Sequence, residues 1–277
     1  MATAEPRDAF YVLGQSAEEY QRLSDQAELF GYFSEQLFLE AGLTRGMRVL
    51  DVGSGAGDVS MLARRMVGPD GLVMGVDTDA QACQKAQQRA NAADYSNVTF
   101  HAGDIRDVPP NESFDAAVGR FVLMYLADPA DALRSIASHV RVGGVLAFQE
   151  MDFTHFPDSE PEVPLWQQCG QWVRECFGRA GTEMRMGFKL YRTFVSAGLP
   201  APHVRSSARI GGGPNFPAYR VLASAVRDIL PALQSFGITT ADEVGIETLE
   251  QRLRTEVTAR CASVVTPNIV GAWTRKR

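Results

Sequence analysis

A glycine-rich turn between a buried strand and a helix is the feature of this sequence that most constrains the fold. Residues 47–66 read MRVLDVGSGAGDVSMLARRM, in which an apolar run ends at Val52 and three alternate glycines follow. Glycine accepts positive φ angles and has no Cβ, so its backbone can lie directly against a bound molecule. Asp58 stands where a helix begins, and helix N-termini attract negative groups. The stretch therefore predicts a strand, a turn that binds a nucleotide-type molecule, and a helix.

The spacing of these glycines separates two cofactor classes. A dinucleotide-binding turn has the pattern G-x-G-x-x-G, whereas Gly53, Gly55 and Gly57 lie two residues apart. Asp51 precedes them, and its carboxylate suits a positively charged ligand better than a pyrophosphate. The D-x-G-x-G-x-G run resembles motif I of the class I S-adenosylmethionine-dependent methyltransferases. The resemblance implies that Asp51, Gly53, Ser54 and Gly55 bind S-adenosylmethionine; a tight turn without a ligand is the alternative.

Acidic residues follow the next two expected strands, at 72–76 and 98–101. Asp77 follows Gly57 by 20 residues, close to the interval at which an acid binds a ribose. The resemblance to methyltransferases implies a ribose site at Asp77 and Thr78. It also implies an adenine site at Asp104 and Ile105, although a plain turn at Asp104 is the alternative.

A fourth expected strand, at 114–118, ends beside the predicted site for the methionine half of the cofactor. The resemblance implies that Arg120 contacts this half, mainly through its main chain, and that Tyr125 lies near the transferred methyl group. The face of a tyrosine ring stabilises a sulfonium by cation–π attraction. Packing in the core is the alternative for Tyr125.

Carboxylates follow a fifth expected strand, at 145–148, after a turn at 141–144. The carboxyl ends of parallel strands form the crevice in which α/β sheets bind ligands. Glu150 is therefore the first candidate for a catalytic base or a substrate-orienting group, and Asp152 and His155 come next. Solvated strand ends are the alternative. No clear set of metal ligands is found, so we expect no metal; a metal-assisted reaction that uses Glu150, Asp152 and His155 is the alternative.

An N-terminal helical lid is predicted over residues 1–46. Ser16 and Glu19 have the spacing of a capping box at the start of one helix, and a second helix is expected over residues 31–41. The region resembles the lid that precedes the core in many small-molecule methyltransferases. The resemblance implies that Tyr11 and Gln26 close over the cofactor, whereas helices packed on the sheet edge are the alternative.

The alternation of strands and helices predicts an α/β fold with a doubly wound, mostly parallel seven-stranded sheet. A sixth strand is expected at 203–210, and an antiparallel last strand at 262–274. The predicted core comprises residues 47–210 and 261–277, with cap insertions at 153–180 and 211–260. The second insertion contains amphipathic segments at 218–236, interrupted at Pro231, and at 241–260, and forms a substrate cap or a homodimer surface.

Composition excludes several partner classes. The net charge is −6 and basic residues gather only at the end of the chain, which argues against nucleic acid as a partner. No run of apolar residues is long enough to span a membrane, so we expect a cytoplasmic protein without a membrane partner.

These patterns together predict S-adenosylmethionine-dependent methyl transfer to a small apolar or aromatic molecule. The accepting atom, oxygen, nitrogen or carbon, is left open. Two alternatives are an NAD(P)-dependent oxidoreductase on a similar sheet, and a protein that binds S-adenosylmethionine without catalysis. The oxidoreductase is disfavoured by the glycine spacing and by the lack of a Tyr-x-x-x-Lys pair.

Overall fold

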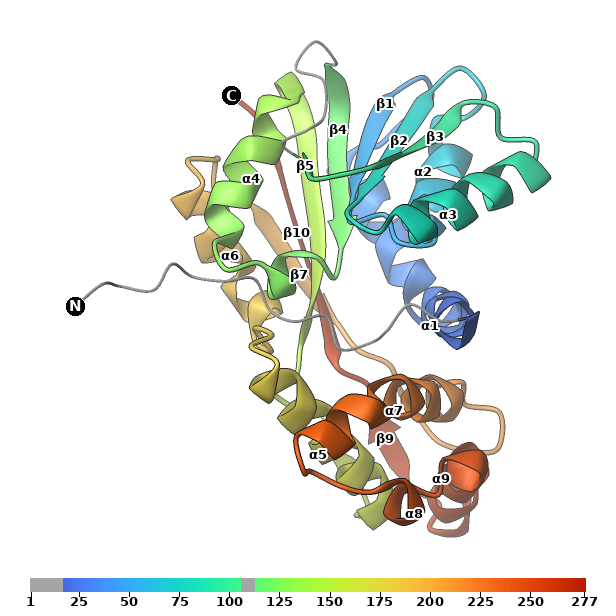
Figure 1. Cartoon of the computed structure of the whole chain (residues 1–277). Helices are drawn as coiled ribbons and strands as arrows, with labels where there is room; N and C mark the ends of the chain where they lie inside the picture. Colours follow the sequence, from blue (N-terminus) through green and yellow to red (C-terminus); the bar gives the residue numbers. More distant parts are fainter. Residues whose placement is uncertain (1–16, 106–112) are drawn as a thin grey trace.

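The computed structural model describes residues 17–105 and 113–277, with side chains from residue 29 onward. Seven strands form the central sheet in the order β3-β2-β1-β4-β5-β10-β7 (Figure 1). Their bounds are β1 Arg48–Val52, β2 Leu72–Asp77, β3 Val98–Ala102, β4 Phe114–Arg120, β5 Val140–Asp152, β7 His203–Ser207 and β10 Asn268–Arg275.

Strands β1 to β5 are parallel, and β10 is antiparallel to both of its neighbours, β5 and β7. This arrangement confirms the predicted fold class. The last strand, β10, is antiparallel as expected; it pairs with β7 and separates β7 from β5. Strand β7 is therefore attached to the sheet only through β10.

Helices cover both faces of the sheet because alternate residues of each strand point to opposite faces. Val49 and Val73 belong to the hydrophobic cluster under α2 and the C-terminal half of α1, whereas Leu50 and Phe148 belong to the cluster under α4 and α6. The helices are α1 Ala17–Ala41, α2 Asp58–Val67, α3 Ala80–Ala92, α4 Pro129–Ser138 and α6 Met186–Ser196.

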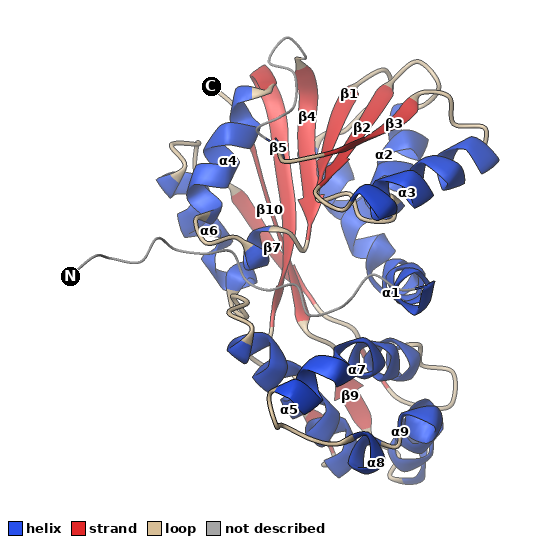
Figure 2. Cartoon of the chain, viewed as in Figure 1, coloured by secondary structure: helices blue, strands red, loops and turns tan. Residues whose placement is uncertain are grey.

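A second layer of helices lies beyond the carboxyl ends of the parallel strands (Figure 2). Helix α5 packs against α7, and both contact α9. The elements are α5 Pro164–Arg179, α7 Ala218–Ser235, α8 Ala241–Val244 and α9 Leu249–Ala259, with a small sheet of β6 Ser159–Glu160, β9 Ser263–Val265 and β8 Ile210–Gly211. We call this layer the cap.

Two helix predictions were wrong because packing overrides local breakers. The lid was expected as two helices, yet α1 runs unbroken through Gly31, whose neighbours Leu29 and Phe30 are buried. Helix α7 likewise continues through Pro231, since Ile229 and Leu233 are buried on either side of it. Tertiary burial of an amphipathic face supplies most helix stability, so it outweighs one lost hydrogen bond.

Other boundaries also differ from prediction. The segment 241–260 is divided at Gly245, whose left-handed backbone (φ 54°) ends α8. The expected strands at 203–210 and 262–274 each divide between the two sheets, because the chain crosses from core to cap at Arg209 and Thr266. The expected turn at 141–144 is an irregularity inside β5, which continues to Asp152.

Candidate active site

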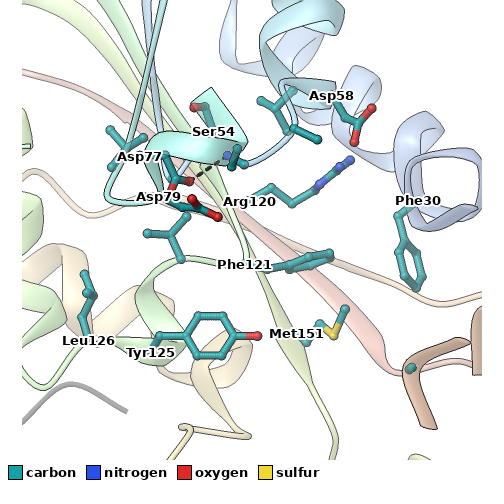
Figure 3. Close-up of a pocket in the computed structure, with 18 of the residues that line it drawn as sticks. Phe30, Ser54, Asp58, Asp77, Asp79, Arg120, Phe121, Tyr125, Leu126 and Met151 are labelled. Carbon is teal, nitrogen blue, oxygen red and sulfur yellow. Dashed lines mark hydrogen bonds between the residues drawn. The ribbon is translucent and has the colours of Figure 1, made fainter. Parts of the chain in front are cut away.

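A cavity of about 490 Å³ lies between the tips of the parallel strands and the cap (Figure 3). We distinguish two halves by the elements that line them. The strand-tip half is lined by the loops that follow β1, β2, β3 and β4, and it holds the charged groups. The cap half is lined mainly by apolar side chains, including Met151, Phe153, Phe156, Trp166, Val173, Phe177, Val221 and Leu222.

The glycine turn after β1 forms the floor of the strand-tip half. Gly53, Gly55 and Gly57 all have positive φ angles, of 66°, 49° and 86°. A Cβ atom at Gly53 would lie 2.4 Å from Val122 Cγ2, so a side chain cannot be accommodated there. The backbone N–H groups of Gly53 and Ser54 donate to the Val76 carbonyl at 2.8 and 3.1 Å, which fastens the turn to β2.

Asp77 ends β2 and lines the cavity directly above this turn. Its Oδ2 accepts a hydrogen bond from the Gly55 N–H at 2.7 Å, and its Oδ1 accepts one from the Asp79 N–H at 2.9 Å. Burial raises the pKa of Asp77, while these two hydrogen bonds act in the opposite direction. A carboxylate has about four lone-pair sites, so Asp77 keeps capacity to accept from a ligand hydroxyl.

The predicted cofactor residue Asp51 lies below the turn and does not line the cavity. Ser60 Oγ donates to its Oδ2 at 2.5 Å, and burial raises its pKa to about 7. Among the described residues, Asp51 Oδ1 and the buried Ser54 Oγ have no hydrogen-bond partner. Ser54 lines the cavity, but its Oγ is buried away from it.

Other predicted cofactor residues also converge on the strand-tip half. Thr78, Asp104, Ile105 and Arg120 all line it. The Arg120 guanidinium points between Asp58 and Phe30 (Figure 3), and its Nη1 donates to Ser34 Oγ on α1 at 3.3 Å. Arg120 was expected to act through its main chain, whereas its side chain enters the cavity.

Tyr125 lies on a 3-10 turn, η2 Leu123–Tyr125, at the boundary between the halves. Its ring lines the cavity, and its hydroxyl points toward Met151 (Figure 3). The sequence alone left core packing as an equal reading for this residue. The structure brings it to the cavity.

Glu150 is placed differently from the prediction. It is fully buried inside β5 and does not line the cavity. Its Oε1 accepts from the N–H groups of Val122 and Leu123 at 3.0 and 2.8 Å, and its Oε2 accepts from that of Met124 at 3.3 Å. Burial raises its pKa to about 7, against the effect of those hydrogen bonds. The geometry makes Glu150 an anchor for the η2 turn and contradicts its prediction as a base that meets the substrate.

His155 also lies outside the site. Its side chain is 71% exposed, does not line the cavity, and has its Nδ1 4.0 Å from Asp158 Oδ2. Tyr11 lies outside the described residues. Gln26 belongs to α1, but its side chain is outside the described set.

Several cavity residues had no signal in the sequence. Phe121 has a positive φ angle of 59°, rare for a bulky residue, and its ring meets the Phe30 ring edge-on at 6.0 Å. Met151 and Leu222 reach the cavity through folding of β5 and α7. Trp166 lines the cap half, whereas the aromatic residues Trp172 and Phe216 do not line the cavity and pack in or against the main hydrophobic cluster.

Neither 17–105 nor 113–277 contains three His, Cys, Asp or Glu side chains grouped to hold a metal ion. Within the same ranges no helix has the length and apolar character needed to cross a bilayer. The four cysteines, of which Cys83, Cys169 and Cys176 are buried, do not line the cavity.

The curated proteins to which this chain is similar include methyltransferases. The chain is 33% identical over 149 residues to an arsenite methyltransferase of Halobacterium salinarum, which covers 53% of this chain and 38% of that protein. It is 30% identical over 125 residues to a demethylmenaquinone methyltransferase of Listeria welshimeri, covering 45% of this chain and 50% of that one. The matches therefore span half or less of these relatives.

Solved structures with similar folds include a SAM-dependent methyltransferase from Aquifex aeolicus, with a TM-score of 0.51 and 21% identity over 72% of this chain and 93% of that one. The YcgJ protein of Bacillus subtilis has a TM-score of 0.54 and 19% identity, over 89% of this chain and 100% of that one. The family profile described as a methyltransferase domain matches residues 43–198, which are more than half of the chain. The chain therefore belongs to the class I S-adenosylmethionine-dependent methyltransferase family.

Proposed function

We propose that this protein transfers a methyl group from S-adenosylmethionine to a small apolar or aromatic molecule. One observation carries the proposal: a single cavity joins a polar half, at the glycine turn and strand tips, to a half lined by aromatic and aliphatic side chains. A polar donor and an apolar acceptor can therefore meet inside one enclosure.

The strand-tip half suits the methyl donor that the family implies. The Asp77 carboxylate is available to ribose hydroxyls, with Thr78 beside it, and Asp104 and Ile105 present an acceptor and an apolar surface for adenine. Gly53, Ser54 and Gly55 line the cavity and offer a close backbone approach. Carboxylates around the turn favour the positive charges of the ammonium and the sulfonium.

We expect the protein to promote methyl transfer mainly by positioning the donor and the acceptor. S-adenosylmethionine supplies a methyl group on a sulfonium, which is a good leaving group. The cavity walls hold the reacting groups together and exclude water, and orientation of this kind lowers the barrier. Tyr125 lines the cavity, and the face of a tyrosine ring can stabilise a cation bound beside it.

The cap half favours an organic acceptor over a metalloid. A soft metalloid is bound best by thiolates, and none of the four cysteines lines the cavity. Of the two acceptor types in the relatives' names, the apolar aromatic demethylmenaquinone has the chemical character of this lining, and arsenite does not. We therefore propose an aromatic or aliphatic small molecule, held under α5 and α7.

Calorimetry tests the donor first. S-adenosylhomocysteine should bind and NADH should not; the reverse result would favour the oxidoreductase alternative. Incubation with S-adenosylmethionine and a panel of hydrophobic phenols, quinols, thiols and amines should then release S-adenosylhomocysteine and add one methyl group to an acceptor by mass. Binding without turnover across the panel would favour a non-catalytic binding protein.

A further inference from the structure

Arg120 has a distinctive position in the strand-tip half. It is the one basic residue among the described residues that line the cavity, and Asp58, Asp77, Asp79 and Asp104 line the same half. The methionine arm of the proposed donor carries an ammonium and a carboxylate. The acids suit the ammonium, whereas a guanidinium presents a planar fork that matches a carboxylate.

A hydrogen-bonded chain holds this guanidinium. Ser34 Oγ donates to Gln149 Oε1 at 2.6 Å, and Arg120 Nη1 donates to the same Ser34 oxygen at 3.3 Å. A serine hydroxyl has a single proton. Since that proton is committed to Gln149, Ser34 faces Arg120 as an acceptor. Ser34 and Gln149 are 0% and 2% exposed, so water does not compete for these bonds.

The chain joins three elements that are distant in sequence. Arg120 ends β4 and pairs with Gln149 on β5 in the sheet register, while Ser34 comes from α1. The Phe121 N–H donates to the Gln149 carbonyl at 2.8 Å, and the Arg120 Cζ atom lies 5.7 Å from the centre of the Phe121 ring. The guanidinium is therefore held from the α1 side by Ser34, and Gln149 on β5 fixes the orientation of that serine.

We propose that the Arg120 guanidinium binds the carboxylate of the donor's methionine arm, and that Ser34 and Gln149 are positioning residues for it. Because Ser34 belongs to α1, loading of the donor would also fix this helix on the core. The inference rests on the proposed function, since it requires an S-adenosylmethionine-type ligand in the strand-tip half.

The test compares two ligands that share adenosine and the thioether. S-adenosylhomocysteine has the amino-acid arm, and 5′-methylthioadenosine lacks it. Arg120→Met should weaken binding of S-adenosylhomocysteine roughly 10- to 100-fold, as expected for loss of a charge-assisted hydrogen bond, and change methylthioadenosine binding by less than about threefold. Ser34→Ala should weaken binding of S-adenosylhomocysteine roughly 3- to 10-fold and leave methylthioadenosine binding unchanged. The double variant should be no weaker than Arg120→Met, because Ser34 acts through Arg120.

Controls separate this inference from the function on which it rests. Arg141→Met removes a cation that pairs with Asp115 away from the cavity, and should change neither affinity. If Arg120→Met fails to fold, Arg120→Lys keeps the charge without the fork and should lose only part of the S-adenosylhomocysteine affinity. Equal losses for both ligands, or no loss, would overturn the role of Arg120 and leave the proposed function standing. Failure of the wild type to bind either ligand would overturn the proposed function itself.

Hydrogen exchange supplies a readout that loss of stability alone would not produce. Peptides from residues 29–41 should gain more protection with S-adenosylhomocysteine than with methylthioadenosine. This difference should vanish in Ser34→Ala. Equal protection by the two ligands in the wild type would contradict the proposed link between the carboxylate and α1.

Discussion

The two halves of the cavity are built by different means. Each loop of the strand-tip half follows a strand directly, so its polar groups lie within a few residues of a sheet element and bond to nearby backbone, as Asp77 does with Gly55. The cap half takes its lining from β5, α5, α7 and the segment at 266–267, which lie far apart in the chain. Its residues are held by packing against one another.

This difference separates two kinds of specificity. In the proposed function, donor recognition depends on backbone geometry and hydrogen bonds that short motifs set, except at Arg120, which the distant Ser34 holds. The proposed acceptor would meet an apolar surface that is also part of the main hydrophobic cluster, in which Phe153, Trp166 and Phe177 are all buried. A substitution in the cap half should therefore change stability, and one in the strand-tip half should change donor affinity.

The largest effect is expected from Trp166→Ala in the cap half. Trp166 is 1% exposed and packs edge-on against Phe156 and Tyr219, so its loss should lower the free energy of unfolding in urea by roughly 3 to 5 kcal/mol. Affinity for S-adenosylhomocysteine should stay within about threefold. Phe188→Ala is the control, because Phe188 is 75% exposed on α6 and should cost less than about 0.5 kcal/mol. A Trp166→Ala protein as stable as the wild type would contradict the view that the cap half is held together by packing.

Glu150 should make the stability of the protein depend on pH. Its side chain anchors the η2 turn at the boundary between the two halves of the cavity. Its pKa is raised from 4.5 to about 7, so the native state keeps a proton that the unfolded chain has already released. The free energy of unfolding should therefore fall by about 2 to 3 kcal/mol as pH rises from about 5 to about 8. Glu150→Gln should reduce this slope in urea titrations at several pH values. The shift at Asp51 has the same direction, so part of the slope should remain; an unchanged slope would refute the assignment.

Asp77→Ala tests the strand-tip half. The variant should weaken S-adenosylhomocysteine binding by roughly 1 to 3 kcal/mol in calorimetry, because it removes the carboxylate that we propose accepts hydrogen bonds from the ribose. Asp115→Ala is matched to it, since Asp115 also accepts a backbone N–H, from Arg48 at 2.8 Å, but on β4 near its amino end. That control should bind normally. Unchanged affinity in Asp77→Ala would place the ribose elsewhere.

The smallest effect is expected in the outer part of the cap. Thr240 caps α8 in a reciprocal capping box with Glu243, so Thr240→Ala should lower the free energy of unfolding by about 1 kcal/mol. Donor affinity should not change, because α8 does not line the cavity. A loss of donor affinity in this variant would show that the outer cap and the strand-tip half are coupled.

Sequence reasoning succeeded where a local motif determines the structure. The glycine turn, Asp77, Asp104 and Arg120 were placed at strand ends by short patterns, and the structure brings them to one cavity. Sequence reasoning failed where tertiary burial determines the position of a side chain. Glu150 has the sequence context of a strand-end acid, yet β5 continues past it and its oxygens accept backbone N–H groups from the η2 turn.

The cap half could not be predicted for the same reason. No local pattern shows that Leu222 and Met151 line one surface, since they meet only after α7 and β5 have packed. Ser34 and Gln149 are also ordinary residues in their own segments. Their pairing across 115 residues emerges only in the folded chain.

The position of β10 has a consequence for synthesis on the ribosome. This strand comes after every other described element, yet it lies between β5 and β7 and provides all of the sheet pairing of β7. Translation must therefore reach residues 268–275 before the sheet can close. Until then β5 exposes an unpaired edge, which is the kind of surface that recruits chaperones or neighbouring nascent chains.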